Sequence, residues 1–121
     1  MICSRKFLNG ALMSAILLSA SASFAVFAGA EPNTHQIIIQ GGEYIPAELT
    51  IQVGDTVQWI NKDFIPHTAT AQDEAQQVLW DTGNLNKGDS AEVQFTEVGL
   101  SEYICLYHPV MKAQITVEAV L

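Results

Sequence analysis

The residues of this chain that could do chemistry gather in one short segment near its carboxyl end. Cys105, His108 and Met111 follow one another at three-residue intervals between two apolar runs. A short loop can direct three such side chains toward one point. Thiolate and imidazole are good ligands for copper, and a thioether is a weak, soft third partner. The spacing therefore predicts a metal site to which this loop contributes three side chains.

A second imidazole must come from elsewhere in the chain. His67 lies at the end of a predicted strand, whereas His35 lies near the start of the predicted domain and is interpreted as a solvated residue. Two His and one Cys in a plane, with a weak axial Met, make the trigonal site of blue copper proteins. We therefore expect one type 1 copper ion held by His67, Cys105, His108 and Met111.

Other interpretations of the same residues stay open at this point. Cys105 could be a buried apolar residue, as free Cys often is, or the nucleophile of a thiol enzyme with a His as its base. One Cys and two His also suit zinc, although Met is a poor zinc ligand. The chain could also be an interaction domain that binds no metal. That interpretation is excluded only if the four side chains converge.

The elements that must position these side chains have the pattern of short β-strands. Apolar and polar residues alternate with a period of two, which places one face of each strand in the core and the other in water. Predicted strands include residues 37–39, 49–53, 57–59, 93–95, 103–105 and 115–117, with glycines between them at 41–42, 54, 83, 88 and 99. The pattern predicts an all-β fold, a sandwich or barrel.

One stretch does not follow this alternation. Residues 71–80 are rich in Ala, Glu and Gln, which favour a short helix or an irregular excursion over a strand. Asp73 is well placed to cap the start of such a helix, with Gln76 three residues further on.

Residues 1–30 differ sharply from the rest of the chain. They hold Arg5 and Lys6, then a long run of Ala, Leu, Ser and Phe, and they end in Ala28, Gly29 and Ala30. A basic start, an apolar middle and a small-residue end are typical of a secretory signal peptide, although the run approaches the length of a membrane anchor. We predict cleavage after Ala30, export to the periplasm, and one domain of residues 31–121 with no stable insertion into the membrane.

Charge and cysteine content narrow the possible partners. The chain has 5 Lys and Arg and 13 Asp and Glu, and only the two basic residues at positions 5 and 6 leave with the signal, so the domain has a net charge of −10 with His neutral. Nucleic acid is not an expected partner, because phosphate backbones attract basic surfaces. Cys105 is the only Cys of the domain, and an unpaired Cys in an exported protein indicates burial, a bond to another chain or metal binding.

Several segments together resemble the cupredoxin family of type 1 blue copper proteins. The resemblance covers nearly all of residues 36–118 and rests on residues 44–51, 54–61, 66–67, 81–83, 88–90 and the loop that follows Cys105. The two-residue gap between His108 and Met111 is most similar to the amicyanin branch. Plastocyanin and pseudoazurin, which have a longer gap there, are similar to a lesser degree.

The resemblance implies a Greek-key β-sandwich of about eight strands and a small soluble carrier of single electrons that is not an enzyme. It also implies that the ring edge of His108 reaches the surface through an apolar patch, formed here by Pro66, Tyr107, Pro109 and Val110. Redox proteins, a donor dehydrogenase or a c-type cytochrome, would dock there with a monomer. The alternative is a module of the same fold that stores or delivers copper. Such a module should carry Met-rich or His-rich tracts, which residues 31–121 lack.

Individual positions near the ligands add three expectations. Thr68 stands where the family often has an Asn that ties the two ligand loops together, and the sequence leaves open whether its hydroxyl does so. Tyr107 stands where amicyanin has Pro, so its N–H is free to donate to the sulfur of Cys105, which would shift the copper potential. Tyr103 resembles the corner tyrosine of Greek-key sandwiches.

Overall fold

The computed structural model describes residues 21–23 and 31–121 of the chain. The predicted signal peptide lies outside the described residues apart from positions 21–23, so its cleavage stays a prediction. Within the part that is described, no helix is long and apolar enough to cross a membrane.

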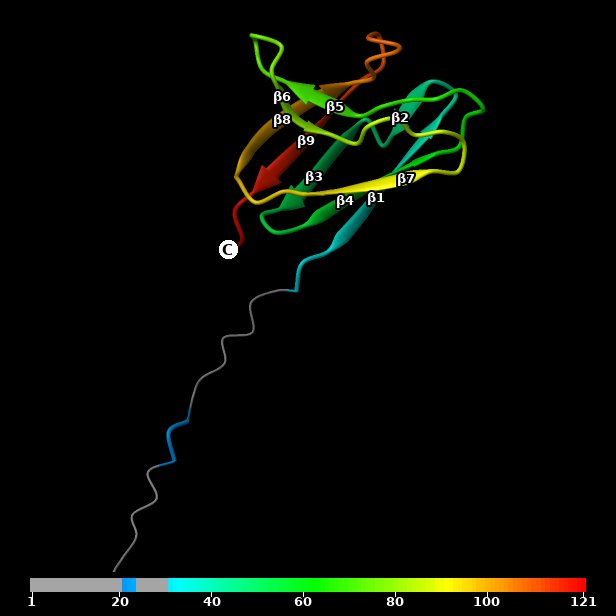
Figure 1. Cartoon of the computed structure of the whole chain (residues 1–121). Helices are drawn as coiled ribbons and strands as arrows, with labels where there is room; N and C mark the ends of the chain where they lie inside the picture. The colour runs from blue at the N-terminus through cyan, green and yellow to red at the C-terminus, as the bar shows by residue number, and fades with distance from the viewer. Residues whose placement is uncertain (1–20, 24–30) are drawn as a thin grey trace, which may run out of the picture.

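In residues 31–121, nine strands form two sheets. The two sheets pack face to face in Figure 1. The first sheet has the order β2-β1-β4-β7 and the second the order β3-β9-β8-β5-β6. Strands β1 and β4 are parallel, as are β3 and β9, and the remaining pairs are antiparallel. In chain order the strands are β1 (Thr34–Gln40), β2 (Glu43–Ile45), β3 (Glu48–Gln52), β4 (Thr56–Asn61), β5 (Thr70–Gln72), β6 (Val78–Asp81), β7 (Ser90–Gln94), β8 (Gly99–Ile104) and β9 (Lys112–Glu118).

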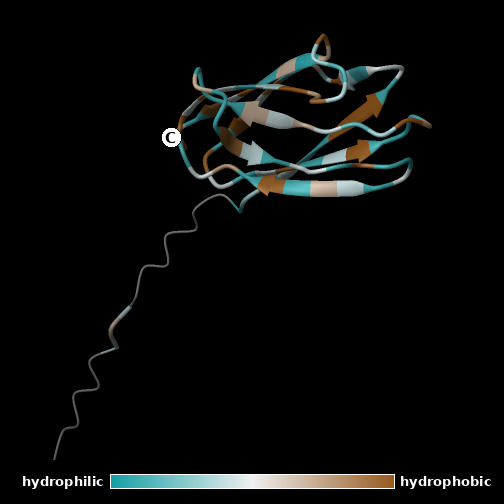
Figure 2. Cartoon of the chain, turned by 45° about the horizontal axis from the view of Figure 1, so that its top comes forward, coloured by the Kyte–Doolittle hydropathy of each residue, from teal (hydrophilic) through white to brown (hydrophobic). Residues whose placement is uncertain are grey.

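This architecture confirms the predicted all-β sandwich. The chain passes from one sheet to the other after β2, β3, β4, β6 and β7, so neighbours in sequence often lie in opposite sheets. The predicted alternation is present: along β4, every second residue is buried, and hydrophobic and hydrophilic bands alternate along the strands in Figure 2. The buried residues from both sheets form one core, which includes Ile37, Ile39, Ile51, Val57, Trp59, Tyr103, Ile115 and Val117.

The prediction for residues 71–80 is wrong, because this stretch forms the β5–β6 hairpin. Asp73 does act as a cap, but of a turn: its carboxylate accepts hydrogen bonds from the N–H groups of Ala75 and Gln77 at 2.9 and 2.8 Å. Ala71 pairs with Trp80 across the hairpin, and both side chains pack in or against the core. Burial of these side chains outweighs the weak local preference for helix.

Tyr103 does not make the hydrogen bond of a corner tyrosine. Its hydroxyl is buried without a hydrogen-bond partner among the described residues, and its ring packs at 4.7 Å from that of Tyr44 and at 5.6 Å from that of Trp59. The tyrosine that does bond to the backbone is Tyr44, whose hydroxyl donates to the carbonyl of Thr68. Burial raises the pKa of Tyr44, as does the nearby Cys105, so the phenol keeps the proton that it donates.

Candidate metal centre

The loop after β8 folds back on itself through two consecutive turns. The N–H of His108 donates to the carbonyl of Cys105 at 3.2 Å, and the N–H of Met111 donates to the carbonyl of His108 at 2.9 Å. The N–H of Cys105 closes the loop on the carbonyl of Met111 at 3.2 Å. These bonds bring the backbone of the three residues together between β8 and β9, as their three-residue spacing predicts.

His67 reaches the same region from the loop between β4 and β5. Its backbone pairs with Leu85 through two hydrogen bonds of 3.1 and 2.8 Å. The buried amide of Asn61, at the end of β4, holds both sides of this bridge by donating to the carbonyls of Ile65 and Leu85. The side chain of His67 is therefore fixed in the interior, where the residue is 0% exposed.

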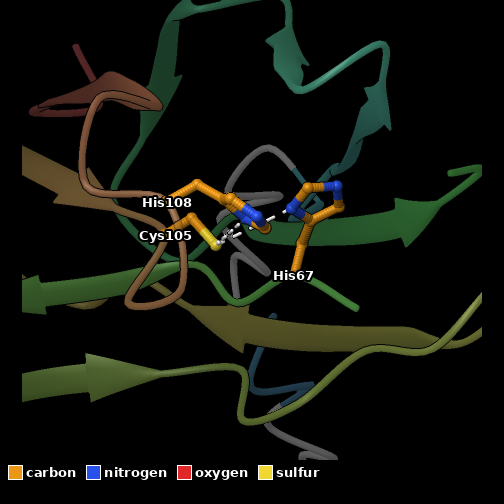
Figure 3. Close-up of side chains that lie close together, drawn as sticks. All are labelled: His67, Cys105 and His108. Carbon is orange, nitrogen blue, oxygen red and sulfur yellow. Dashed lines mark hydrogen bonds between the residues drawn. The ribbon is translucent and has the colours of Figure 1, made fainter. Parts of the chain in front are cut away.

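The three strong ligands predicted from the sequence converge, as Figure 3 shows. The Nδ1 atoms of His67 and His108 each lie 3.7 Å from the sulfur of Cys105. Cys105 and His67 are buried, whereas His108 is half-buried. The two imidazole rings lie close together, with their centroids 5.1 Å apart and their planes at 59°.

These distances fit a metal ion placed between the three atoms. Divalent zinc bonds to imidazole nitrogen at about 2.0 Å and to thiolate at about 2.3 Å, and two such bonds at 120° separate nitrogen from sulfur by about 3.7 Å. The spacing therefore fits a bound metal ion, and a donor set of one thiolate and two imidazoles is typical of type 1 copper.

A carboxylate behind His67 fixes the protonation of its ring. The Nε2 atom of His67 lies 2.9 Å from Oδ2 of Asp63. Because an ionised carboxylate can only accept, Nε2 carries the proton, and the lone pair of Nδ1 points toward Cys105. Carboxylates in this position are common behind metal-binding His residues, where they set the tautomer and the ring orientation.

Asp63 is itself held by the hairpin between β1 and β2. The N–H groups of Gly41 and Gly42 donate to its two carboxylate oxygens at 2.7 and 2.9 Å. Both glycines have positive φ, 65° and 72°, as the turn of a two-residue hairpin requires. Burial raises the pKa of Asp63, but the N–H groups of Gly42 and Gly41 and the ring of His67 together lower it below its ordinary value. Sequence reasoning missed Asp63, whose position four residues before His67 does not by itself indicate a role at the site.

Thr68 connects the two ligand loops and contacts the sulfur. Its N–H donates to the sulfur of Cys105 at 3.4 Å, and its hydroxyl accepts the N–H of Leu106 at 3.0 Å. The question that the sequence left open is therefore answered, because Thr68 does tie the loops together. The additional bond expected from the N–H of Tyr107 to the sulfur is not among the hydrogen bonds found in residues 31–121.

The remaining predicted positions divide between the interior and the surface. Met111 is buried at the end of the ligand loop and packs in the core. The four residues of the predicted apolar patch are all exposed, with Val110 exposed by 89%. His35 is not simply solvated as we expected, because its Nε2 lies 2.8 Å from a carboxylate oxygen of the buried Asp55.

Known proteins with similar sequences and structures belong to one family of copper-binding proteins. Residues 33–118 match the family described as copper binding proteins, plastocyanin/azurin family. Amicyanin from Paracoccus denitrificans is 35% identical over 97 residues, which cover 76% of this chain and 72% of amicyanin.

Two solved structures extend the comparison to the fold. A purple cupredoxin from Nitrosopumilus maritimus has a TM-score of 0.63 at 37% identity, over 69% of this chain and 99% of that protein. A mutant of amicyanin with Cu(I) has a TM-score of 0.65 at 30% identity, over 70% of this chain and 82% of that protein.

Proposed function

This chain belongs to the plastocyanin/azurin family of copper-binding proteins, and we propose that His67, Cys105, His108 and Met111 hold one copper ion in it. Its function is that of a small blue copper protein that carries single electrons between redox partners. The observation that supports the ligand assignment best is the pair of 3.7 Å distances from the sulfur of Cys105 to the two Nδ1 atoms. Copper, when bound, supplies the one-electron chemistry between Cu(I) and Cu(II).

The protein's own contribution is to fix the ligands before any electron arrives. The backbone bridge to Leu85 and the carboxylate of Asp63 hold the ring of His67, and the N–H of Thr68 bonds to the sulfur of Cys105. Ligands held in this way cannot follow the geometric preference of either oxidation state, so little rearranges during electron transfer. Met111 would be the fourth residue to hold the ion, and its weakly binding thioether would tune the reduction potential.

The burial of the site favours the electron carrier over the alternative functions. A protein that delivers copper must pass the ion to a partner through exposed ligands, yet His67 and Cys105 are both 0% exposed. The same burial argues against a thiol enzyme, whose nucleophile must reach a substrate. We therefore propose that this chain transfers electrons through the edge of the half-buried His108 and is not an enzyme.

The surface around His108 is the proposed docking site for redox partners. The residues of the predicted apolar patch are all exposed: Pro66, Tyr107, Pro109 and Val110. Such an apolar surface suits the small, transient contacts of electron-transfer proteins. A dehydrogenase donor or a c-type cytochrome acceptor, docking on a monomer, would use this surface.

We also propose export of the protein to the periplasm. The support is the composition of residues 1–30, with a basic start, an apolar middle and a small-residue end. Cleavage after Ala30 would release residues 31–121, which contain the nine strands of the described sandwich and every proposed ligand.

The test of the ligand assignment is a spectroscopic titration of residues 31–121 with Cu(II). We expect one equivalent of copper to produce an intense thiolate-to-copper charge-transfer band and narrow copper hyperfine splitting in EPR. Cys105→Ala should lose the band completely, because the thiolate is the electron donor of that transition. A colourless complex with the EPR of ordinary tetragonal copper would overturn the assignment.

The axial role of Met111 has its own test. Met111→Leu conserves the volume of the side chain, so the fold and the charge-transfer band should persist. Without the weak thioether contact, Cu(II) loses more stabilisation than Cu(I), and we expect the reduction potential to rise. An unchanged potential, measured by voltammetry on both proteins, would mean that Met111 is only a core residue.

A further inference from the structure

A chain of hydrogen bonds runs from the surface of strand β6 to the residue that follows Cys105. The N–H of Leu106 lies 3.0 Å from the hydroxyl oxygen of Thr68. That oxygen lies 3.0 Å from the hydroxyl oxygen of Thr70, which lies 2.7 Å from a carboxylate oxygen of Asp81. Neither Thr70 nor Asp81 belongs to the proposed ligand set.

The direction of every bond in this chain follows from its two ends. The backbone N–H of Leu106 can only donate, and the carboxylate of Asp81 can only accept. The single hydroxyl proton of Thr70 is therefore directed to Asp81. Thr68 must then donate its own proton to Thr70 while it accepts from Leu106, so both hydroxyl groups have one defined orientation.

The burial of the two threonines fixes the orientation of their hydroxyl groups. Thr68 and Thr70 are 3% and 0% exposed, so water cannot replace a missing partner. A buried hydroxyl without a partner is costly. The charge on Asp81 strengthens its own bond with Thr70 and, through polarisation, the bonds further along the chain.

Thr68 is the point at which this chain meets the metal centre. Besides its hydroxyl contacts, its N–H donates to the sulfur of Cys105, and its carbonyl accepts the hydroxyl of Tyr44. A change in the orientation of Thr68 would therefore affect both the loop at Leu106 and the bond to the sulfur.

We infer that Asp81 and Thr70 are positioning residues of the copper centre, which hold Thr68 so that it restrains the Cys105 loop and keeps its hydrogen bond to the sulfur. The inference rests on the proposed role of Cys105 as a copper ligand. It gives a function to a carboxylate on the edge strand β6, which β5 separates from β8 in the second sheet.

The experiment compares four variants with the wild-type protein. Thr70→Val removes the hydroxyl at nearly constant volume, Thr70→Ser restores it, and Asp81→Asn removes the charge at the end of the chain. Asp89→Asn is the control for loss of a carboxylate that accepts a hydrogen bond, because Asp89 accepts the N–H of Asn86 and lies outside the hydrogen-bond chain. All variants are first compared by thermal unfolding.

The first readout is hydrogen exchange of the Leu106 amide in the copper-free protein, measured by NMR. We expect exchange to be faster by about tenfold in Thr70→Val, the effect of one weakened hydrogen bond, and faster by a smaller factor in Asp81→Asn. Thr70→Ser and Asp89→Asn should match the wild type. If Thr70→Val does not fold, the test compares the exchange rate of the Leu106 amide in Asp81→Asn with that in Asp89→Asn.

The second readout is the charge-transfer band and EPR spectrum of the Cu(II) protein. We expect a shifted or broadened band in Thr70→Val and Asp81→Asn, with the wild-type spectrum in Thr70→Ser and Asp89→Asn. Wild-type Leu106 exchange and wild-type spectra in both Thr70→Val and Asp81→Asn would overturn the inference, even if both variants were less stable. Absence of the band in the wild-type protein would instead overturn the copper assignment, and the exchange data would still test the chain.

Discussion

Each end of the sandwich contains one histidine paired with one aspartate, and the two pairs have nearly the same geometry. At the end where the described domain begins, Nε2 of His35 lies 2.8 Å from Asp55. At the other end, Nε2 of His67 lies 2.9 Å from Asp63. In both pairs backbone N–H groups hold the carboxylate, those of Asn33 and Gln52 for Asp55 and those of the Gly41–Gly42 turn for Asp63.

The difference between the pairs lies in the surroundings of the histidine. The side chain of His35 is 29% exposed, whereas that of His67 is 1% exposed and has its Nδ1 atom 3.7 Å from a thiol sulfur. The first pair therefore ties the start of β1 to the turn before β4. The second pair directs a lone pair toward a metal position. A histidine–aspartate pair alone does not identify a functional site, and the partner of the second ring nitrogen decides its role.

The largest expected contrast between the two ends is in copper affinity. Asp63→Asn leaves one acceptor oxygen in place of two, so the amide N–H₂ must face either the N–H of His67 or the N–H of Gly41. The negative charge that favours the proton on Nε2 of His67 is lost as well. We expect copper affinity to fall by roughly 10- to 100-fold, the usual effect of removing such a partner. Competition with a copper chelator measures the affinity.

The matched control for that experiment is Asp55→Asn. It makes the same chemical change in a pair of the same geometry that has no metal ligand beside it. Its copper affinity should remain that of the wild type. Equal losses in the two variants would show that the effect on copper binding comes from general destabilisation.

Electron exchange between two copies of the protein should also distinguish the two ends. Val110 is 89% exposed beside His108, and Val98 is 63% exposed before β8 at the other end. Val110→Asp would bring two like charges together whenever two docking surfaces meet, so self-exchange should slow by about tenfold or more at low salt. Val98→Asp should exchange at the wild-type rate, as NMR line broadening in mixtures of Cu(I) and Cu(II) protein can measure. If self-exchange slowed to a similar degree in both variants, the surface around His108 would not be the docking surface.

The far pair should instead contribute to stability. In Asp55→Asn, the buried amide cannot accept from both His35 and the backbone N–H groups of Asn33 and Gln52. One buried donor is left unpaired, and the melting temperature should fall by something on the order of 5–10 °C. Thermal unfolding of the copper-free proteins, followed by circular dichroism, measures the change. An unaltered melting temperature would mean that this pair does not stabilise the fold.

The smallest expected effect is in the pH dependence of stability. The N–H of Asn33 lowers the pKa of Asp55, burial opposes this, and His35 lowers the pKa further, so that the net change is downward. A lowered folded-state pKa contributes stability that is fully present above the ordinary value of about 3.9 and is lost as the pH falls through the folded-state value. The difference in melting temperature between the wild type and Asp55→Asn should therefore shrink below about pH 4. A constant difference down to pH 3 would contradict this.

The fold was predictable where local pattern and final burial agree. The alternation around Trp59 and Ile115 predicts strands whose apolar faces pack in the core, and both are buried. Residues 71–80 were not predictable in this way, because the helix preference of Ala and Gln is local. The hairpin depends on the turn at Asp73 and on packing against distant strands.

The part of the site that lies on one loop was predictable from the sequence, and the part that depends on distant contacts was not. Cys105 and His108 lie on one short loop, so their spacing alone indicates convergence. Asp63 could not be found from the sequence, because it acts through a turn more than twenty residues away and through His67. Thr70 and Asp81 were missed for the same reason, since they meet only when β5 and β6 pair.

The most direct test of the account is X-ray absorption of the copper protein in both oxidation states. A preformed site predicts one sulfur and two imidazole nitrogens at short distance in Cu(I) and in Cu(II), with only small changes in bond length between them. Loss of an imidazole or the gain of extra oxygen ligands in one oxidation state would contradict the claim that the fold holds the ligands in place for electron transfer.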